Sequence, residues 1–118
     1  LLYSLEAGLG SDDLAVVTAQ TGRQGVEAVR ARRPDAVVLD VRLPDMTGLE
    51  ALARVREADP RLPVIVITAF AATGTAIEAV KRGAFEYLLK PIDLHQLDEV
   101  VGRAFELRRM QATPAVVA

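Results

Sequence analysis

The chain has 118 residues, of which 51% are hydrophobic and 25% charged, a composition that predicts one globular domain with its own core. Fourteen basic residues nearly balance sixteen acidic ones, which argues against a dedicated nucleic-acid-binding domain. No apolar run could span a bilayer, the opening lacks a signal peptide, and the absence of cysteine excludes a disulfide scaffold. We therefore expect a cytoplasmic protein without direct contact with membrane or nucleic acid.

The first ten residues have the spacing of a helix. The chain does not open on methionine, which indicates a fragment or a partial record.

Three leucines, Leu2, Leu5 and Leu9, predict a short helix at the start of the chain, and it would end at Gly8 or Gly10.

Four apolar segments predict the strands of a sheet. Ala36–Leu39 and Val64–Ile67 are continuous and rich in β-branched residues, as strands covered on both faces are. Leu14–Val17 and Phe85–Leu89 are weaker examples of the same pattern. A polar turn and then a helical pattern follow each segment, so parallel strands with helical crossovers are expected.

Helix starts are marked by a Thr or Asp with Glu or Gln three residues later, the pattern of a capping box. The pairs are Thr21 with Gln24, Thr47 with Glu50, Thr75 with Glu78, and Asp93 with Gln96. The predicted helices are Thr21–Arg32, Gly48–Ala58, Thr75–Arg82 and Leu94–Arg109. Together with the strands they predict an α/β fold with a doubly wound parallel sheet, in which ligands bind at the carboxyl ends of the strands.

Three polar residues stand at those strand ends. Asp40, Thr68 and Lys90 each follow a predicted strand and should converge on one edge of the sheet. A carboxylate can attack phosphorus, an ammonium can pair with phosphate oxygens, and a hydroxyl can donate to them. Taken alone, Asp40 would be a turn former, Thr68 an ordinary strand residue and Lys90 a solvated lysine; the combination favours phosphoryl chemistry.

Three segments resemble the receiver domain of two-component response regulators: VVLDVRLPDMTGLE around Asp40, VIVITAFA around Thr68, and FEYLLKPID around Lys90. The resemblance covers residues 1–110, and residues 111–118 look like the start of a linker. The segments ITAFA and AIEAVKRGAFEYLLKPID look most like enhancer-binding activators of the NtrC class. The resemblance implies a flavodoxin-like sheet with the strand order 2-1-3-4-5.

The resemblance also implies a function. Asp40 would accept a phosphoryl group from a histidine kinase, with Mg²⁺ bound by Asp40 and by the backbone carbonyl of Arg42. The domain would be a signalling switch and not an enzyme, and it would regulate an output domain beyond residue 118, one that controls transcription. The domain is also expected to form a homodimer.

Other residues take their roles from the same resemblance. Thr68 would move to hydrogen-bond the phosphoryl group, and Tyr87 would rotate into the vacated space. Lys90 would hold the phosphate, and its peptide bond to Pro91 would be cis. Tyr87 is equally well explained as a packing residue.

One part of the family pattern is missing, since the sequence opens inside what resembles the helix after the first strand. That strand ends in the acidic pair that binds the metal; Asp12 and Asp13 precede a strand instead, so we interpret them as a solvated turn. The absent strand would lie between Leu14–Thr18 and Ala36–Asp40. We expect preceding residues to supply it, or the chain to swap, dimerise or rearrange, with weak magnesium affinity and slow phosphorylation.

Several polar residues have simpler explanations. Asp45 is interpreted as a turn residue, and His95 as an exposed residue of a helix start. Arg103, Arg108 and Arg109 are interpreted as a solvated helix face.

Two alternatives to the phospho-switch stay open. One is a pseudo-receiver, an interaction module that acts without phosphorylation. The other is an unrelated doubly wound enzyme or nucleotide binder, which is weakened because the sequence has no GxGxxG or GxxxxGK[ST] loop.

Overall fold

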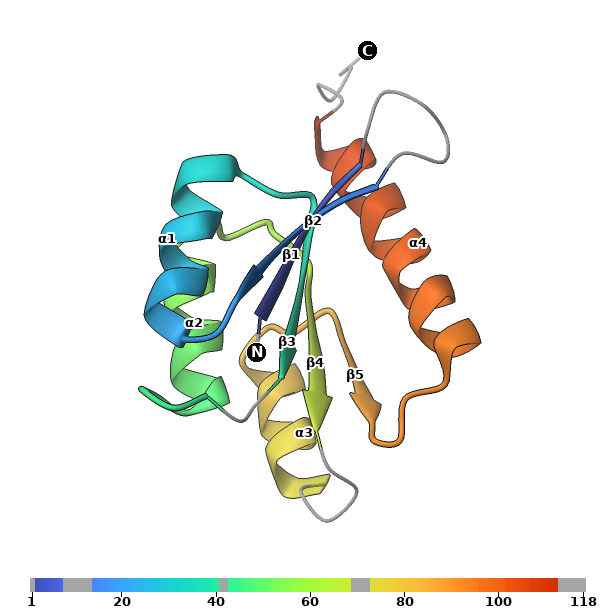
Figure 1. Cartoon of the computed structure of the whole chain (residues 1–118). Coiled ribbons are helices and arrows are strands. Elements are labelled where there is room, and N and C mark those ends of the chain that lie inside the picture. Colours follow the sequence, from blue (N-terminus) through green and yellow to red (C-terminus); the bar gives the residue numbers. More distant parts are fainter. Residues whose placement is uncertain (1, 8–13, 41–42, 69–72, 113–118) are drawn as a thin grey trace.

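The computed structural model describes residues 2–7, 14–40, 43–68 and 73–112 (Figure 1). Strands and helices alternate after an opening pair of strands. The strands are β1 (Leu2–Ala7), β2 (Leu14–Ala19), β3 (Ala36–Asp40), β4 (Val64–Thr68) and β5 (Glu86–Leu89). The helices are α1 (Gly22–Arg32), α2 (Gly48–Ala58), α3 (Thr73–Lys81) and α4 (Leu94–Ala112).

The five strands form one sheet in the order β2-β1-β3-β4-β5, which is the order of a flavodoxin-like receiver fold. Strand β4 is parallel to β3 and to β5, with Asp40 opposite Ile67 and Thr68 opposite Leu89. Strand β1 is antiparallel to β2 and to β3, with Leu2 opposite Leu39. The sheet is therefore parallel from β3 to β5 and mixed where β1 is inserted.

The predicted helix at the start of the chain is wrong, because Leu2–Ala7 form β1. An open position between β2 and β3 would leave backbone donors and acceptors unpaired, at about 1–3 kcal/mol for each buried group. An isolated helix this short is marginal in water. The backbone hydrogen bonds that Leu2–Ala7 form with β2 and β3 therefore favour a strand over the helix that the leucine spacing predicts. Only residues 8–13 separate β1 from β2; a parallel crossover needs about a dozen residues or more, whereas an antiparallel connection does not.

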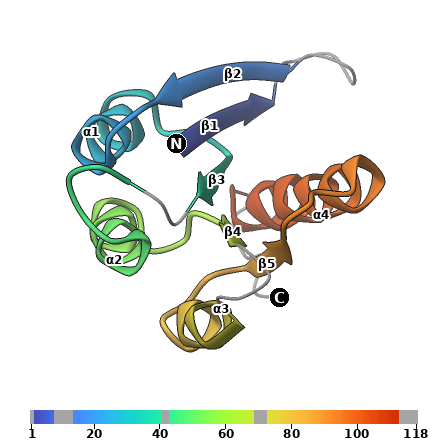
Figure 2. The ribbon, with the colours of Figure 1, turned by 60° about the horizontal axis from the view of Figure 1, so that its bottom comes forward.

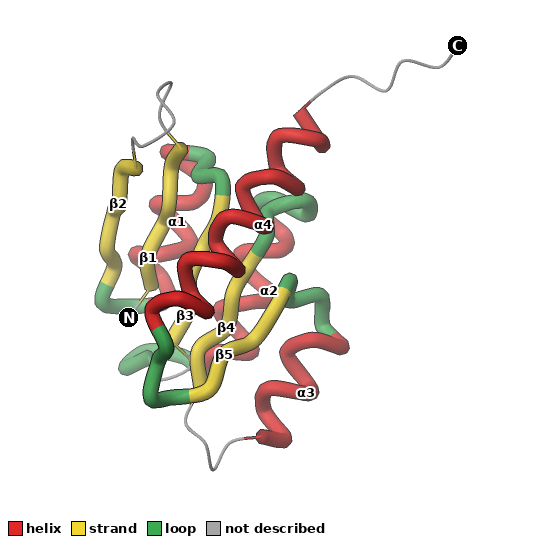
Figure 3. Tube along the Cα trace, turned by 90° about the vertical axis from the view of Figure 1, so that its right-hand side faces the viewer, coloured by secondary structure: helices red, strands yellow, loops and turns green. Residues whose placement is uncertain are grey.

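Helices cover the two faces of the sheet unequally. Helices α1, α2 and α3 lie on one face and α4 lies on the other (Figures 2 and 3). Alternate residues of the strands point to opposite faces, so Val37 and Leu39 belong to the core under α1–α3, while Ala36 and Val38 belong to the core under α4. The largest side chains without solvent contact include Leu39, Leu52, Leu62 and Ile65.

Most of the predicted helix starts are confirmed. The hydroxyls of Thr21 and Thr47 accept hydrogen bonds from Gln24 N and Glu50 N, both at 3.1 Å, and Asp93 Oδ1 accepts one from His95 N at 2.9 Å. The other helix starts earlier, since α3 begins at Thr73, two residues before the predicted cap. Helix α4 continues to Ala112. None of the helices in the described ranges has the length and apolar character needed to cross a membrane.

Candidate functional site

The carboxyl ends of three neighbouring parallel strands meet at one edge of the sheet. Strand β3 ends at Asp40 and β4 ends at Thr68, while Lys90 directly follows β5. Lys90 N donates a hydrogen bond of 2.8 Å to the Thr68 carbonyl oxygen, which joins the last two strand ends. The structure thus places all three residues at the edge where the sequence predicts a site.

Asp40 and Lys90 form a direct ion pair at this edge. Lys90 Nζ lies 2.6 Å from Asp40 Oδ2, the short distance expected of a charge-assisted hydrogen bond. The side chain of Asp40 is 23% exposed and that of Lys90 is 39% exposed. The carboxylate is therefore accessible from solvent and already has a cation beside it.

Thr68 is a buried polar residue whose hydroxyl is unused. Its exposed fraction is 0%, and within the described part of the chain Oγ1 has no hydrogen-bond partner. A buried unpaired polar atom costs about 1–3 kcal/mol and is uncommon in folded proteins. The hydroxyl of the last residue of β4 therefore keeps an unused hydrogen-bonding capacity.

The remaining predicted residues lie near this edge or outside the described ranges. Tyr87 is half-buried and packs against the core under α1–α3. The Lys90–Pro91 peptide bond is cis, as the family resemblance implies. Arg42, the predicted carbonyl ligand, lies outside the described residues, and so do Asp12 and Asp13.

The described residues do not make a complete magnesium site. Magnesium is held by carboxylates and other oxygens in near-octahedral geometry. Among residues 2–7, 14–40, 43–68 and 73–112, no group of three or more acidic, His or Cys side chains could hold a metal ion. Strand β1 places Leu2 beside the end of β3, and the ammonium of Lys90 occupies one oxygen of Asp40. Asp40 is thus the one carboxylate that these described strands bring to the edge.

Asp45 has a structural role that its interpretation as a turn residue missed. Its two carboxylate oxygens accept hydrogen bonds from Gly22 N at 2.8 Å and Arg23 N at 3.0 Å, so a residue of the β3–α2 loop caps α1. A Cβ atom on Gly22 would lie 2.5 Å from Met46 Sδ, which shows how closely the loop packs on the helix start. The sequence carried one signal: the first turn of α1 has no acidic residue of its own.

The pKa of Asp45 makes this cap testable. Hydrogen bonding from Gly22 N is the largest influence, and the pKa lies below the ordinary value of 3.8. A lowered pKa in the folded state means that the carboxylate stabilises the fold above pH 3.8, and that this contribution is lost as the pH falls through the folded pKa.

Asp45→Asn is therefore expected to lower the urea midpoint near neutral pH, because the amide supplies one oxygen in place of two. The gap between the variant and the unchanged chain should close as the pH falls from about 6 to about 2. Asp98→Asn, on the exposed face of α4, is the control and should not reproduce that closing gap. A gap that is constant across this range would contradict the cap.

Comparison with known proteins supports the family resemblance. The family model of the response regulator receiver domain matches residues 1–102. Regulatory protein AtoC of Escherichia coli K12 is 42% identical over 93 residues, which cover 79% of this chain and 20% of that protein. The DNA-binding transcriptional regulator NtrC of the same strain is 36% identical over 112 residues, covering 95% of this chain and 24% of NtrC. The chain thus spans about a quarter of the length of these relatives or less.

Solved structures agree with the sequence relatives. A response regulator receiver domain from Clostridium thermocellum has a TM-score of 0.77 at 28% identity, covering 80% of this chain and 77% of that one. NtrX from Brucella abortus has a TM-score of 0.75 at 31% identity, covering 80% of this chain and 22% of that one. The chain therefore belongs to the response regulator receiver domain family, and its relatives include activators of the NtrC class.

Proposed function

We propose that this domain is a phospho-aspartate switch with Asp40 as the acceptor. A carboxylate oxygen of Asp40 would attack the phosphorus of a phosphohistidine on a histidine kinase, the P–N bond would break, and the imidazole would leave. The observation that carries the proposal is the 2.6 Å contact of Asp40 with Lys90 at the edge where Thr68 also ends its strand. As a receiver domain, the chain is a signalling module and not a catalytic enzyme.

The charge added at Asp40 supplies the signal. A phosphoryl group brings about −1.5 to −2 charges near neutral pH. Lys90 would then bind phosphoryl oxygens, and the unpartnered hydroxyl of Thr68 would turn to donate to one of them. Tyr87, half-buried beside this edge, would move into the space that Thr68 leaves.

The response would pass to α3, β5 and α4. Moving a two-state equilibrium from 1:99 to 99:1 requires about 5.5 kcal/mol, so a partial shift of populations is more plausible for one new group. On α3, Ile77 is 49% exposed and Val80 is 44% exposed, which leaves apolar surface for a second copy of the domain. We propose that phosphorylation promotes a homodimer through this face.

The output of the switch is proposed from the relatives. AtoC and NtrC are much longer than this chain, and the second is a DNA-binding transcriptional regulator by name. We propose that residues 1–110 form the receiver, that residues 111–118 begin a linker, and that an output domain beyond it controls transcription in the cytoplasm. The receiver itself would not contact DNA.

A pseudo-receiver is the second candidate. It is favoured by one observation: among the described residues, no group of three or more acidic, His or Cys side chains could hold a metal ion. Magnesium binding by Asp40 and the Arg42 carbonyl would need further oxygen ligands, and we expect weak magnesium affinity for the chain in this fold.

Phosphorylation with acetyl phosphate tests the proposal, with and without magnesium. Intact mass should rise by one phosphoryl group in the unchanged chain and in Asp98→Asn, whereas Asp40→Asn should take up none because an amide is no nucleophile for phosphorus. Peptide mapping should place the group on Asp40. A label that persists in Asp40→Asn would refute the acceptor assignment, and no label under any condition would favour the pseudo-receiver.

A further inference from the structure

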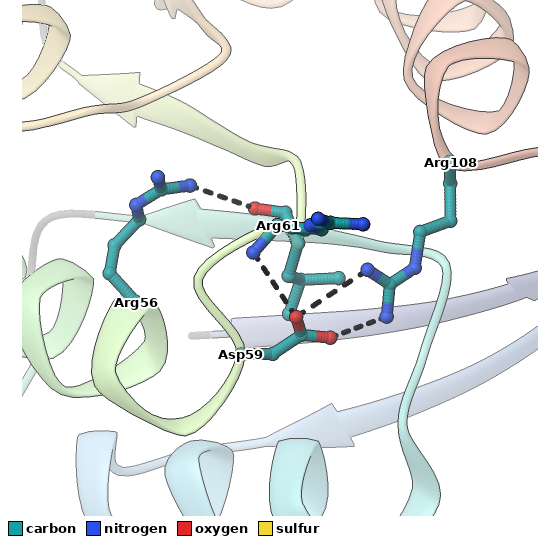
Figure 4. A network of polar contacts seen from close by, with 5 residues as sticks. Arg56, Asp59, Arg61 and Arg108 are labelled. Carbon is teal, nitrogen blue, oxygen red and sulfur yellow. Dashed lines mark hydrogen bonds and ion pairs between the residues drawn. The ribbon is translucent and has the colours of Figure 1, made fainter. Parts of the chain in front are cut away.

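A basic cavity lies at the opposite end of the sheet from Asp40. It has a volume of about 560 Å³ and is bordered by Arg30 and Arg33 at the end of α1, by Asp59 and Arg61 in the turn before β4, and by Arg108 on α4. Strands β3 and β4 begin beside it and run away from it toward the proposed phosphorylation site. Figure 4 shows Asp59, Arg61 and Arg108 at this place.

The only carboxylate among these described lining residues is already occupied. Asp59 is bound by Arg108 through two contacts, Nη1 to Oδ1 at 3.4 Å and Nη2 to Oδ2, and Arg61 N donates to Oδ1 at 3.2 Å (Figure 4). Burial would by itself raise the pKa of Asp59, but the hydrogen bond from Arg108 and further contacts hold that pKa below its ordinary value. Asp59 is therefore ionised, and its carboxylate is paired with the guanidinium of Arg108.

Three guanidinium groups at the cavity have no such partner. Within the described part of the chain, the side chains of Arg30, Arg33 and Arg61 make no hydrogen bond or ion pair, although the charge of Arg33 still acts on Asp59 from a distance. All three residues are exposed. With Arg108 and Asp59, the five side chains carry a formal charge of +3 (four arginines less one aspartate), whereas the whole chain carries −2. Positive charge is thus concentrated here against the overall sign.

The helix dipole explains only part of this concentration. Cations near a helix C-terminus are stabilising, which accounts for Arg30 and Arg33 at the end of α1. It does not account for Arg61, which lies in a turn. The nearby helix-end carbonyls are also satisfied: Val29 O accepts from Arg33 N at 3.0 Å, and Val55 O accepts from Asp59 N at 2.9 Å.

The volume and lining of the cavity fit a small ligand. Its volume falls within the range of about 300–1,000 Å³ that small-molecule sites occupy. Val29, Ala58 and Pro60 add an apolar border. A guanidinium is planar and matches two phosphate oxygens at once, so several of them around one hollow favour an anion with more than one phosphate group.

We propose that this cavity binds a small anion carrying two or more phosphate groups, held by Arg30, Arg33 and Arg61. The Asp59–Arg108 pair fixes the wall of the site. Such a ligand would bridge α1, the turn before β4 and, through Arg108, the helix α4. The site is separate from Asp40 and does not depend on the proposed phosphorylation.

Calorimetric titration of the chain with inorganic pyrophosphate at low salt tests the site. Binding should saturate and weaken as salt is added, because screening acts on exposed charges. Arg30→Gln combined with Arg61→Gln should weaken binding about tenfold or more, since two charge-assisted contacts are lost. Arg23→Gln combined with Arg54→Gln, which removes two exposed arginines beside a neighbouring hollow that shares only Arg30 with the cavity, should change binding less than about twofold. Equal weakening in the two double variants would overturn the proposal.

Two further titrations test where the anion binds and whether the site prefers an anion with more than one phosphate group. Asp40→Asn should bind pyrophosphate as the unchanged chain does; loss of binding there would assign the anion to the Asp40 edge and refute the cavity. Sulfate at matched ionic strength should bind more weakly than pyrophosphate, and equal binding would refute a site for several phosphate groups. Urea unfolding of each variant confirms that the compared proteins are folded.

Discussion

Replacing Thr68 with valine is expected to make the domain more stable. Valine has nearly the same shape as threonine but lacks the hydroxyl, and Thr68 Oγ1 is fully buried without a hydrogen-bond partner in the described chain. Removing such an atom should raise the free energy of unfolding by about 1–3 kcal/mol. Urea denaturation of the two proteins measures the difference, and a loss of stability in Thr68→Val would show that the hydroxyl has a partner.

The same replacement should weaken the response to phosphorylation. In the proposed switch, the hydroxyl of Thr68 is the donor that a phosphoryl group on Asp40 draws toward itself, and valine has nothing to donate. The acetyl phosphate reaction should still modify Asp40, while the accompanying amide shifts in α3 should shrink. Thr68→Ser keeps the hydroxyl and should keep those shifts, at some cost in packing. Full shifts in Thr68→Val would refute the role of Thr68 but leave Asp40 as acceptor.

Truncating Leu52 to alanine should cost more than any surface change. Leu52 lies on α2, has an exposed fraction of 0% and belongs to the core under α1–α3. A buried Leu→Ala change removes apolar contacts and leaves a cavity, which costs about 2–5 kcal/mol. Domains of this kind are stable by about 5–15 kcal/mol in total, so unfolding should begin at much lower urea.

A surface variant separates core packing from the general effect of truncation. Ile77→Ala removes a side chain that is 49% exposed, and its cost should stay within about 0.5 kcal/mol. Below the urea range where Leu52→Ala unfolds, Asp40 should still accept a phosphoryl group, because Leu52 is a core residue of α2 and not one of the residues at the strand ends. Equal losses of stability in Leu52→Ala and Ile77→Ala would contradict the assignment of this core.

The sequence was sufficient to predict the strands and helix starts that are determined by neighbouring residues in the chain. The continuous, β-branched apolar runs of β3 and β4 predicted buried strands correctly, and the Thr21 and Thr47 caps mark the helix starts where the structure has them. Because parallel strands place their carboxyl ends together, knowing where the strands end was enough to bring Asp40 and Lys90 to one edge.

Contacts between distant segments required the tertiary structure. The leucine spacing of residues 2–9 favours a helix, yet the position between β2 and β3 is filled by Leu2–Ala7 as an antiparallel strand, since its backbone groups pair on two sides. Asp45 caps α1 from a loop 23 residues away. The basic cavity unites arginines from α1, a turn and α4, a concentration that a nearly neutral composition conceals. In the first two cases hydrogen bonds between residues far apart in the chain decide the outcome, and in the third the packing of α1, the turn before β4 and α4 brings the arginines together. Local sequence patterns contain no information about such distant contacts.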